Sequence, residues 1–188
     1  SDPSIHPFAT ESCDGVDQNC DDILDDSDSC WTAIYRFRDP ETGAWCWNDA
    51  TAAPATCDGY TRELEAWIVP SAPIPNSWDA VQCSLDTDHI IVERHSADMS
   101  ALDGAGYDCG TVSLGHPWLL GSAPSAAILP FGQPCDLYRF AHDTGAGGTH
   151  LFTRGADDTA GMTCEPPARG VVLTQHTCFS GTPEGCGS

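Results

Sequence analysis

The chain has 188 residues, 40 % of them hydrophobic, and its 28 acidic residues against seven basic ones give a net charge of −21. This size and hydrophobic content predict one domain with a buried core. So acidic a surface excludes nucleic acid as a partner, because nucleic-acid binding needs a basic face, and it favours cations or neutral ligands such as sugars. No apolar run approaches the length of a membrane span, so we expect no membrane insertion.

Eleven cysteines in a chain of this length predict an oxidising compartment and several disulfides. No C-x-x-C spacing occurs, which argues against zinc ribbons and thioredoxin-type motifs. The first residues, SDPSIHP, have no signal-peptide pattern. We therefore expect the mature or trimmed form of a secreted or cell-surface protein, acting as a monomer.

Residues 1–12 contain prolines among polar residues and predict a linker or terminal arm, and residues 13–30 form a separate acidic segment. Oxygen-bearing side chains recur in this segment at positions 1, 3, 5, 9 and 12 of a loop: Asp17, Asn19, Asp21, Asp25 and Asp28. The carbonyl of Ile23 would fall at position 7. Ca²⁺ takes about six to eight oxygens, and alternate residues of a tight loop can converge on one point. The spacing therefore predicts a calcium loop, free-standing because no helix-forming sequence flanks it.

In the rest of the chain, short runs rich in Ile, Val, Tyr, Phe and Trp are separated by Gly, Pro, Asp and Asn. This pattern predicts an all-β domain over residues 31–183 and a tail at 184–188. IYRFRDPETGAWCW, from Ile34, and LYRFAHDTGAGGTHLF, from Leu137, repeat one hairpin pattern, and a degraded copy starts at Ile90. Three copies predict a disulfide-rich β-trefoil. A three-bladed propeller would be too small to close well, and a two-sheet sandwich requires no threefold repeat.

The cysteines follow the same repetition. One precedes the first strand of each copy and another follows the second strand, at nearly equal spacing in all three. This predicts one bridge per copy and two local pairs: Cys30–Cys57, Cys83–Cys109, Cys135–Cys164, Cys13–Cys20 and Cys178–Cys186. Cys46 is left without a partner, as a small buried hydrophobe or, in the alternative, a reactive thiol. A rival pairing joins Cys30 to Cys13 or Cys20 and closes the acidic segment on itself.

The string CDGVDQNCDDILDD, from Cys13, resembles the MopE-type metal-binding motif of secreted bacterial proteins, with Asp22 where the family has glycine. The resemblance implies a disulfide-closed calcium loop, which maps onto Cys13, Cys20, Asp14, Asp17, Asn19, Asp21 and Asp26. Copper, which the family name suggests, prefers His or sulfur ligands. We expect neither a histidine nor a free thiol in this segment.

The two YRF hairpins, with EAWIV at residues 65–69, resemble the repeats of an uncharacterised secreted bacterial family of the form [VL]-Y-R-F-Y-N-x-x-T-G-x-H-F-Y-T. The resemblance implies a β-trefoil attached to larger extracellular proteins, and it implies no activity. In the Tyr-Arg-Phe triplets at 35–37 and 138–140, alternation predicts buried aromatics and an outward arginine that meets solvent or an aspartate.

No HExxH, G-x-S-x-G or phosphate-binding glycine loop occurs. The sequence favours a calcium-stabilised, lectin-like binding module for carbohydrate or another cell-surface ligand, held by an aromatic face and Asp or Asn acceptors. The candidate ligand residues are Asp39, Trp45, Trp47 and Asp49 in the first copy and Asp143, His150 and Asp157 in the third. The alternative for each tryptophan is a position in the core. Alternative functions are a spacer without glycan binding and a hydrolase built from scattered carboxylates and histidines.

Overall fold

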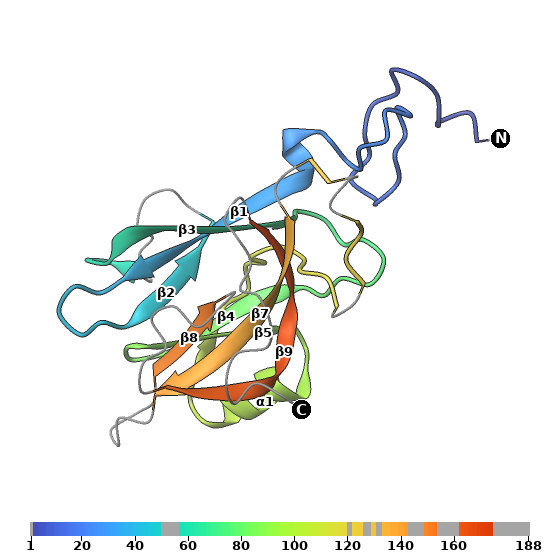
Figure 1. The fold of residues 1–188 in the computed structure, drawn as a ribbon. Coiled ribbons are helices and arrows are strands. Elements are labelled where there is room, and N and C mark those ends of the chain that lie inside the picture. The colour runs from blue at the N-terminus through green and yellow to red at the C-terminus, as the bar shows by residue number, and fades with distance from the viewer. Residues whose placement is uncertain are drawn as a thin grey trace.

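The computed structural model describes residues 2–49, 57–119, 122–125, 129–130, 133–142, 149–153 and 162–174. Its elements follow the chain as η1 (Asp28–Cys30), β1 (Trp31–Arg38), β2 (Trp45–Asn48), β3 (Thr61–Pro70), β4 (Ala80–Leu85), β5 (Asp88–Glu93), α1 (Ala97–Gly104), β6 (Asp108–Cys109), β7 (Gln133–His142), β8 (Thr149–Thr153) and β9 (Thr163–Thr174). The described structure is mostly β, as the sequence predicts. Figure 1 shows the N-terminal segment standing away from the strands and entering them through β1.

One antiparallel unit of three strands occurs three times. β1 lies between β2 and β3, β4 lies between β5 and β6, and β7 lies between β8 and β9. The first and third units join through β3 and β9 into a six-stranded sheet of order β2-β1-β3-β9-β7-β8, while the second forms its own sheet of order β5-β4-β6. β2, β5 and β8, the second strands of the three units, contact one another. The units are therefore grouped around their second strands.

The second unit begins earlier in the chain than the sequence pattern suggested. Its central strand is β4, and Ile90, expected to open the copy, lies in β5 opposite Cys83. The hairpin turn follows Leu85, and Asp86 adopts φ 52°, a left-handed conformation that aspartate tolerates better than most side chains. The run of Ile and Val in β5 hides this register, because it resembles the apolar first strand of the other copies.

All three units contribute to one hydrophobic core. Its fully buried members include Trp47 of β2, Trp67 of β3, Val81 of β4 and Val172 of β9. The rings of Trp47 and Trp67 stack with their centroids 5.7 Å apart. Burial of a large apolar side chain contributes about 1.5–3 kcal/mol, and this stacked pair joins β2 to β3 within the first unit.

One short helix interrupts the strands. α1 starts after Ser96, whose hydroxyl accepts the backbone N–H of Met99 at 3.1 Å and so caps the first turn. It spans 8 residues, which is too few to show a helical period over three turns, and the sequence did not predict it. Among the described residues, no helix is long and apolar enough to cross a membrane.

The disulfide pairing differs from the prediction in the first unit. We expected the pairs Cys13–Cys20 and Cys30–Cys57, but the structure has the bridges Cys13–Cys30 and Cys46–Cys57. Cys46 is therefore bonded, and Cys20 is the free, exposed cysteine among the described residues. Cys30 ends η1, where its Cα is 4.9 Å from that of Cys13, whereas Cys46 is buried in β2 with its Cα 6.0 Å from that of Cys57. The rival pairing of Cys30 with Cys13 is thus the correct one, because equal spacing in sequence did not mean equal placement in the fold.

The other predicted bridges stand as follows. Cys83–Cys109 is present and joins β4 to β6. Cys135 and Cys164 are each disulfide-bonded. Cys178 and Cys186 lie outside the described residues.

The first Tyr-Arg-Phe triplet does not alternate as predicted. Arg36 is 6 % exposed and its guanidinium forms an ion pair with Glu63 of β3. The β1–β3 register shifts between Tyr35 and Phe37, and this bulge allows both Arg36 and Phe37 to be buried. The expectation of an outward arginine was therefore wrong here. Arg139, its counterpart in β7, is half-buried.

Candidate metal-binding motif and ligand clefts

Residues 17–23 form a tight acidic loop held by side-chain oxygens. Asp17 accepts the backbone N–H groups of Cys20 at 2.7 Å and Asp22 at 2.9 Å through its two carboxylate oxygens. Asn19 accepts the N–H of Asp21, and Asp21 accepts that of Ile23, both at 2.9 Å. These are turns in which an Asp or Asn side chain replaces a backbone carbonyl. The three residues predicted at loop positions 1, 3 and 5 therefore do lie in one loop.

Left-handed backbone recurs through the acidic segment. Cys20, Asp22 and Asp25 have φ values of 62°, 71° and 47°. Asp22 thus adopts the conformation that glycine would supply at the position where the resemblance expects glycine. The departure in sequence keeps the turn at a conformational cost, because a side chain in this region is strained by about 1–2 kcal/mol.

Two carboxylates in the segment each hold an oxygen that is shielded from solvent and has no hydrogen-bond partner among the described residues: Asp25 Oδ1 and Glu11 Oε2. Asp25 is 3 % exposed, and its Oδ2 accepts the N–H of Gly15 at 2.9 Å. Glu11 Oε1 accepts the N–H of Asn19 at 3.0 Å. Burial raises the pKa of both carboxyls, and the nearby charges of Asp26, Asp25 and Asp17 raise the pKa of Glu11 further.

Glu11 was not predicted as a site residue, since it falls in the stretch expected to be a linker. Residues 6–12 instead pack on the loop. The backbone N–H of His6 donates to the carbonyl of Gln18 at 2.9 Å, and the backbone N–H of Ser12 donates to the Gln18 side-chain oxygen at 3.1 Å. Gln18 is 4 % exposed. The only signal in the sequence was an acid two residues before Cys13.

The remaining predicted ligands lie at the edge of the loop. Asp14 accepts the N–H of Val16 at 3.0 Å and the Gln18 amide at 2.7 Å. Asp26 and Asp28 are exposed, and Ile23 is half-buried. No group of three or more His, Cys, Asp or Glu side chains converges as a metal cage in the described part of the chain. The predicted set of eight ligands is therefore not gathered around one point.

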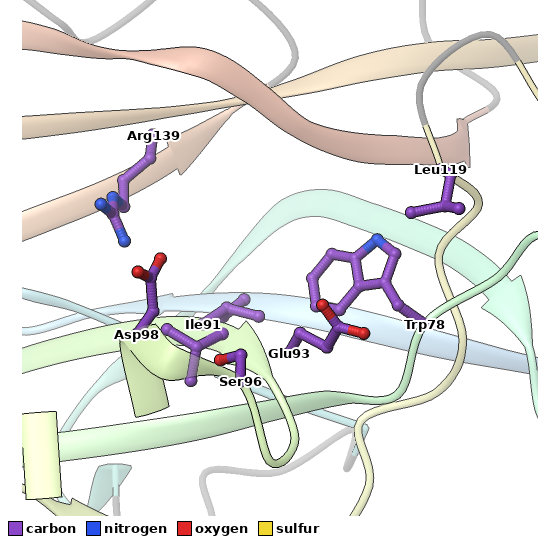
Figure 2. Close-up of a pocket in the computed structure, with 8 residues that line it drawn as sticks. Trp78, Ile91, Glu93, Ser96, Asp98, Leu119 and Arg139 are labelled. Carbon is purple, nitrogen blue, oxygen red and sulfur yellow. The ribbon is translucent and has the colours of Figure 1, made fainter. Parts of the chain in front are cut away.

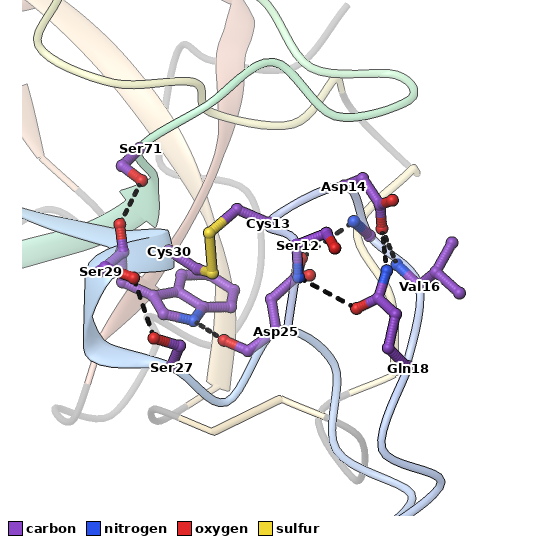
Figure 3. The surroundings of a disulfide bond; sticks show 12 residues. Ser12, Cys13, Asp14, Val16, Gln18, Asp25, Ser27, Ser29, Cys30 and Ser71 are labelled. Atoms are coloured by element: carbon purple, nitrogen blue, oxygen red, sulfur yellow. Dashed lines mark hydrogen bonds between the residues drawn. A yellow bond between two sulfur atoms is a disulfide. The ribbon is translucent and has the colours of Figure 1, made fainter. Parts of the chain in front are cut away.

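The motif is fastened to the β structure at the start of β1. The Trp31 indole N–H donates to the carbonyl of Asp25 at 2.6 Å. Asp25 lies close to the Cys13–Cys30 bridge (Figure 3). Ser71, just after β3, donates its backbone N–H to the carbonyl of Cys30 at 2.9 Å and its hydroxyl to that of Ser29 at 2.8 Å. These contacts hold the motif to the first unit.

The expectation that the segment has no free thiol was wrong. Cys20 is free and exposed within the loop, and its Sγ lies 3.9 Å from the carbonyl oxygen of Gln18. The same carbonyl accepts the backbone N–H of His6. A sulfur atom is thus available in the loop, whereas the His6 imidazole contacts the carbonyl of Pro7.

The predicted ligand residues of the first copy are dispersed. Trp45 and Trp47 are 9 % and 0 % exposed and belong to the core, so their aromatic faces are not binding surfaces. Asp39 stabilises its own turn: it accepts the Thr42 hydroxyl at 2.6 Å and the Glu41 N–H at 2.8 Å, and the hydroxyl bond in particular lowers its pKa. Asp49 is exposed. Asp143 and Asp157 lie outside the described residues, and for His150 only the backbone, in β8, is described.

A cleft that we call the Asp49 cleft lies between the first and second units. Its volume is ≈ 200 Å³, and Asn48, Asp49, Gln82 and Asp108 are among the residues that line it. Trp47 also lines it. Two of the predicted ligand residues therefore meet here, although the tryptophan presents no open face.

A second cleft, the Trp78 cleft, lies between the second and third units and has a volume of ≈ 130 Å³. Trp78, Ile91, Glu93, Asp98, Leu119 and Arg139 line it, and Figure 2 shows the side chains of Arg139 and Asp98 pointing toward one another. Sequence reasoning missed this set, because its members come from the segment before β4, from β5, from α1 and from β7.

Comparison with known proteins finds a family match only for the N-terminal segment. The Cu-binding MopE family model, described as a "putative metal-binding motif", matches residues 1–26. No curated protein and no solved structure matches the chain. Residues 1–26 thus carry a motif of the metal-binding class, and the match extends to the stretch that contains His6 and Glu11.

Proposed function

We propose that this chain is an extracellular binding module whose N-terminal motif holds a calcium ion and whose β structure takes a ligand of the carbohydrate class. The observation that carries the calcium site is the pair of shielded, unpartnered oxygens on Asp25 and Glu11. Leaving charged oxygens without partners away from water is costly, and a bound cation would remove that cost. The disulfides support an extracellular location.

The donor chemistry favours calcium over copper. The loop offers carboxylate, amide and carbonyl oxygens, which hard cations prefer, and Ca²⁺ tolerates the irregular geometry of such a loop. A copper site would draw on Cys20 and His6, since copper prefers sulfur and imidazole. Both ions therefore belong in the same experiment, with calcium as the expected ligand.

In this proposal calcium stabilises the join between the motif and the β structure. Glu11, Asp17 and Asp25 carry like charges within one small segment, and a bound cation would offset their repulsion. The Asp25 carbonyl accepts the Trp31 indole N–H, and Cys13 is bonded to Cys30. A more ordered loop would therefore also hold the first residue of β1 more rigidly.

For the β structure we propose a trefoil-like arrangement of the three units, with ligands bound between neighbouring units. Contact among the second strands β2, β5 and β8 supports the arrangement, and the two clefts between units support the binding role. A spacer without glycan binding is the second candidate. The observation in its favour is the disulfide that joins Cys13 of the motif to Cys30, the residue before β1.

The calcium site is tested by isothermal titration of the full chain, disulfides intact, with Ca²⁺, Mg²⁺ and Cu²⁺, beside thermal melts with each ion and with chelator. We expect Ca²⁺ to bind and to raise the melting temperature. Asp25→Asn should abolish both effects, whereas Asp103→Asn, a matched change at an exposed acid of α1, should leave them intact. Binding of copper alone, or equal effects of the two variants, would refute a calcium site at Asp25.

A further inference from the structure

A third cleft, which we call the Trp118 cleft, lies between the metal-binding motif and the β structure. It has a volume of ≈ 190 Å³. An engineered apolar cavity of about 150 Å³ in another protein takes up benzene, so a cleft of this size can hold one compact apolar group. Apolar side chains of its wall come from the motif and from the β structure: Leu24, Trp31, Ile74, Pro75, Trp118 and Leu129.

The Trp118 cleft holds one charged side chain among the described residues that line it, and this is the buried carboxylate of Asp25. Its Oδ2 accepts the N–H of Gly15, which also lines the cleft, whereas its Oδ1 has no hydrogen-bond partner among the described residues. Burial raises the pKa of this carboxyl, because its negative charge is poorly solvated. The wall of the cleft therefore carries a negative charge that no described neighbour neutralises.

This charge selects the sign of a ligand. An anion would be repelled by Asp25 and by a chain of net charge −21. A neutral group would leave the carboxylate as poorly solvated as before. A cation is attracted by the carboxylate, and Coulomb attraction at low dielectric acts over several ångströms, so it needs no contact with the shielded oxygen.

The aromatic wall favours a cation as well. Trp31 is half-buried and lines the cleft, and its ring lies 6.0 Å from the buried ring of Trp118. The face of an indole attracts a cation through its quadrupole, most strongly where water is excluded. No described residue that lines the cleft is basic, so no side chain there competes for this position.

The shielding of Asp25 Oδ1 determines which kind of cation fits. A primary ammonium carries three N–H donors. With Oδ1 out of reach, the other side-chain acceptors in the described lining are uncharged and belong to Asn76 and Ser122. A primary ammonium would therefore lose hydrogen bonds that it makes with water. A quaternary ammonium donates no hydrogen bond, and its methyl groups suit the apolar surfaces of Ile74 and Leu129.

We propose that the Trp118 cleft binds the quaternary ammonium group of a small soluble molecule, with the methyl groups against Trp31 and the positive charge facing Asp25. The site is separate from the two clefts between units, and its ligand differs in class from a carbohydrate. The inference does not rest on the proposed function. A phosphate close to the ammonium group, as in a lipid headgroup, would weaken binding because it brings a negative charge toward Asp25.

The test is a series of ligand-observed NMR titrations of the full chain, disulfides intact, with probes of similar shape. Choline is the quaternary ammonium, neohexanol is its neutral carbon isostere, and tert-butylacetate is the anionic form. Ethanolamine is the primary ammonium, and glycerophosphocholine represents the lipid headgroup. We expect choline to bind about tenfold or more tightly than neohexanol and ethanolamine. Glycerophosphocholine should bind more weakly than choline, and tert-butylacetate should not bind.

Variants locate the site. Asp25→Asn keeps the shape of the side chain and should reduce the preference for choline over neohexanol to about threefold or less. Asp103→Asn removes the same charge from an exposed acid of α1 and should leave the preference within about twofold. Trp31→Phe keeps an aromatic face and should bind choline more tightly than Trp31→Leu, which keeps only an apolar one. Circular dichroism shows whether each variant is folded.

Several results would overturn the proposal. If choline does not bind, the cleft is not a site. If choline and neohexanol bind equally, or if Asp25→Asn keeps the full preference, the charge of Asp25 does not select the ligand. If ethanolamine binds as tightly as choline, the quaternary class is wrong. Every titration contains chelator, because a calcium ion on Asp25 would cancel its charge. The calcium and carbohydrate proposals are therefore judged by their own experiments.

Discussion

The indole Nε1 of Trp31, the first residue of β1, donates to the carbonyl of Asp25 in the metal-binding motif at 2.6 Å. The carboxylate of the same aspartate is buried, with one oxygen unpartnered among the described residues. One residue thus connects the candidate cation site with the start of the β structure. The Trp31 ring also lies 6.0 Å from the ring of Trp118, at an interplanar angle of 47°. A change in the order of the motif would therefore change the surroundings of Trp31 and Trp118, and tryptophan fluorescence should report it.

Trp31→Phe removes this donor while keeping an aromatic ring. We expect a loss of about 1 kcal/mol in the free energy of unfolding, because a buried carbonyl loses its partner, and a weaker affinity for Ca²⁺. Chemical denaturation and calcium titration measure the two effects. Unchanged calcium affinity would mean that the motif binds its ion independently of β1.

Asp22→Gly should stabilise the motif. Asp22 has φ 71°, a conformation that glycine adopts without strain, so we expect a gain of up to about 1 kcal/mol after the entropy of the unfolded chain is counted. Gly59→Ala is the reciprocal control: Gly59 has φ 82° and nothing within 4 Å of an added Cβ, so its loss should destabilise through backbone strain alone. A destabilising Asp22→Gly would show that the Asp22 side chain does more than occupy a turn.

The cysteine pairing predicts which thiol reacts. Under native, non-reducing conditions we expect a thiol reagent to label Cys20, and mass spectrometry of a protease digest to find peptides linked by Cys13–Cys30 and Cys46–Cys57. Cys20→Ser should leave thermal stability unchanged. Cys46→Ser should destabilise the chain by about 2–5 kcal/mol, the usual cost of losing a native disulfide. Labelling of Cys46 instead would restore the pairing predicted from the spacing.

His89 should make the fold sensitive to acid. It is 3 % exposed and its ring contacts the Ser84 hydroxyl at 2.9 Å. Burial lowers its pKa below the ordinary value of 6.5, an effect that Asp88 only partly opposes. The unfolded chain therefore takes up the proton more readily, so the stability from neutral His89 is present above pH 6.5 and is lost as the pH falls through the lowered pKa.

The measurement is the free energy of unfolding at about pH 7.5 and about pH 5, compared between wild type and His89→Gln. The variant should lose less stability on acidification, whatever its absolute stability. His95→Asn is the control, because His95 is exposed and its φ of 61° suits asparagine. An equal acid response in wild type and His89→Gln would assign the sensitivity to other groups.

Local features of the sequence predicted the structure where neighbours in the chain decide it. The alternation of Asp17, Asn19 and Asp21 produced the turn-forming loop, because each side chain bonds a backbone N–H only two to five residues away. The hairpin of β1 and β2 formed as the YRF pattern indicated, since strand pairing across a short turn needs only alternation and turn residues.

Features that depend on contacts distant in sequence could not be predicted. The Cys13–Cys30 bridge depends on where η1 places Cys30, and the burial of Arg36 depends on a β1–β3 bulge that brings Glu63 beside it. Glu11 became a candidate ligand only because residues 6–12 fold back onto Gln18. The Trp78 cleft brings Glu93 and Arg139 together from different units. Composition and spacing by themselves thus determined the β class, the acidic loop and the abundance of disulfides. Tertiary packing decided which cysteines pair and which polar groups are left without partners. The reason is that only packing removes water from a few of many similar side chains.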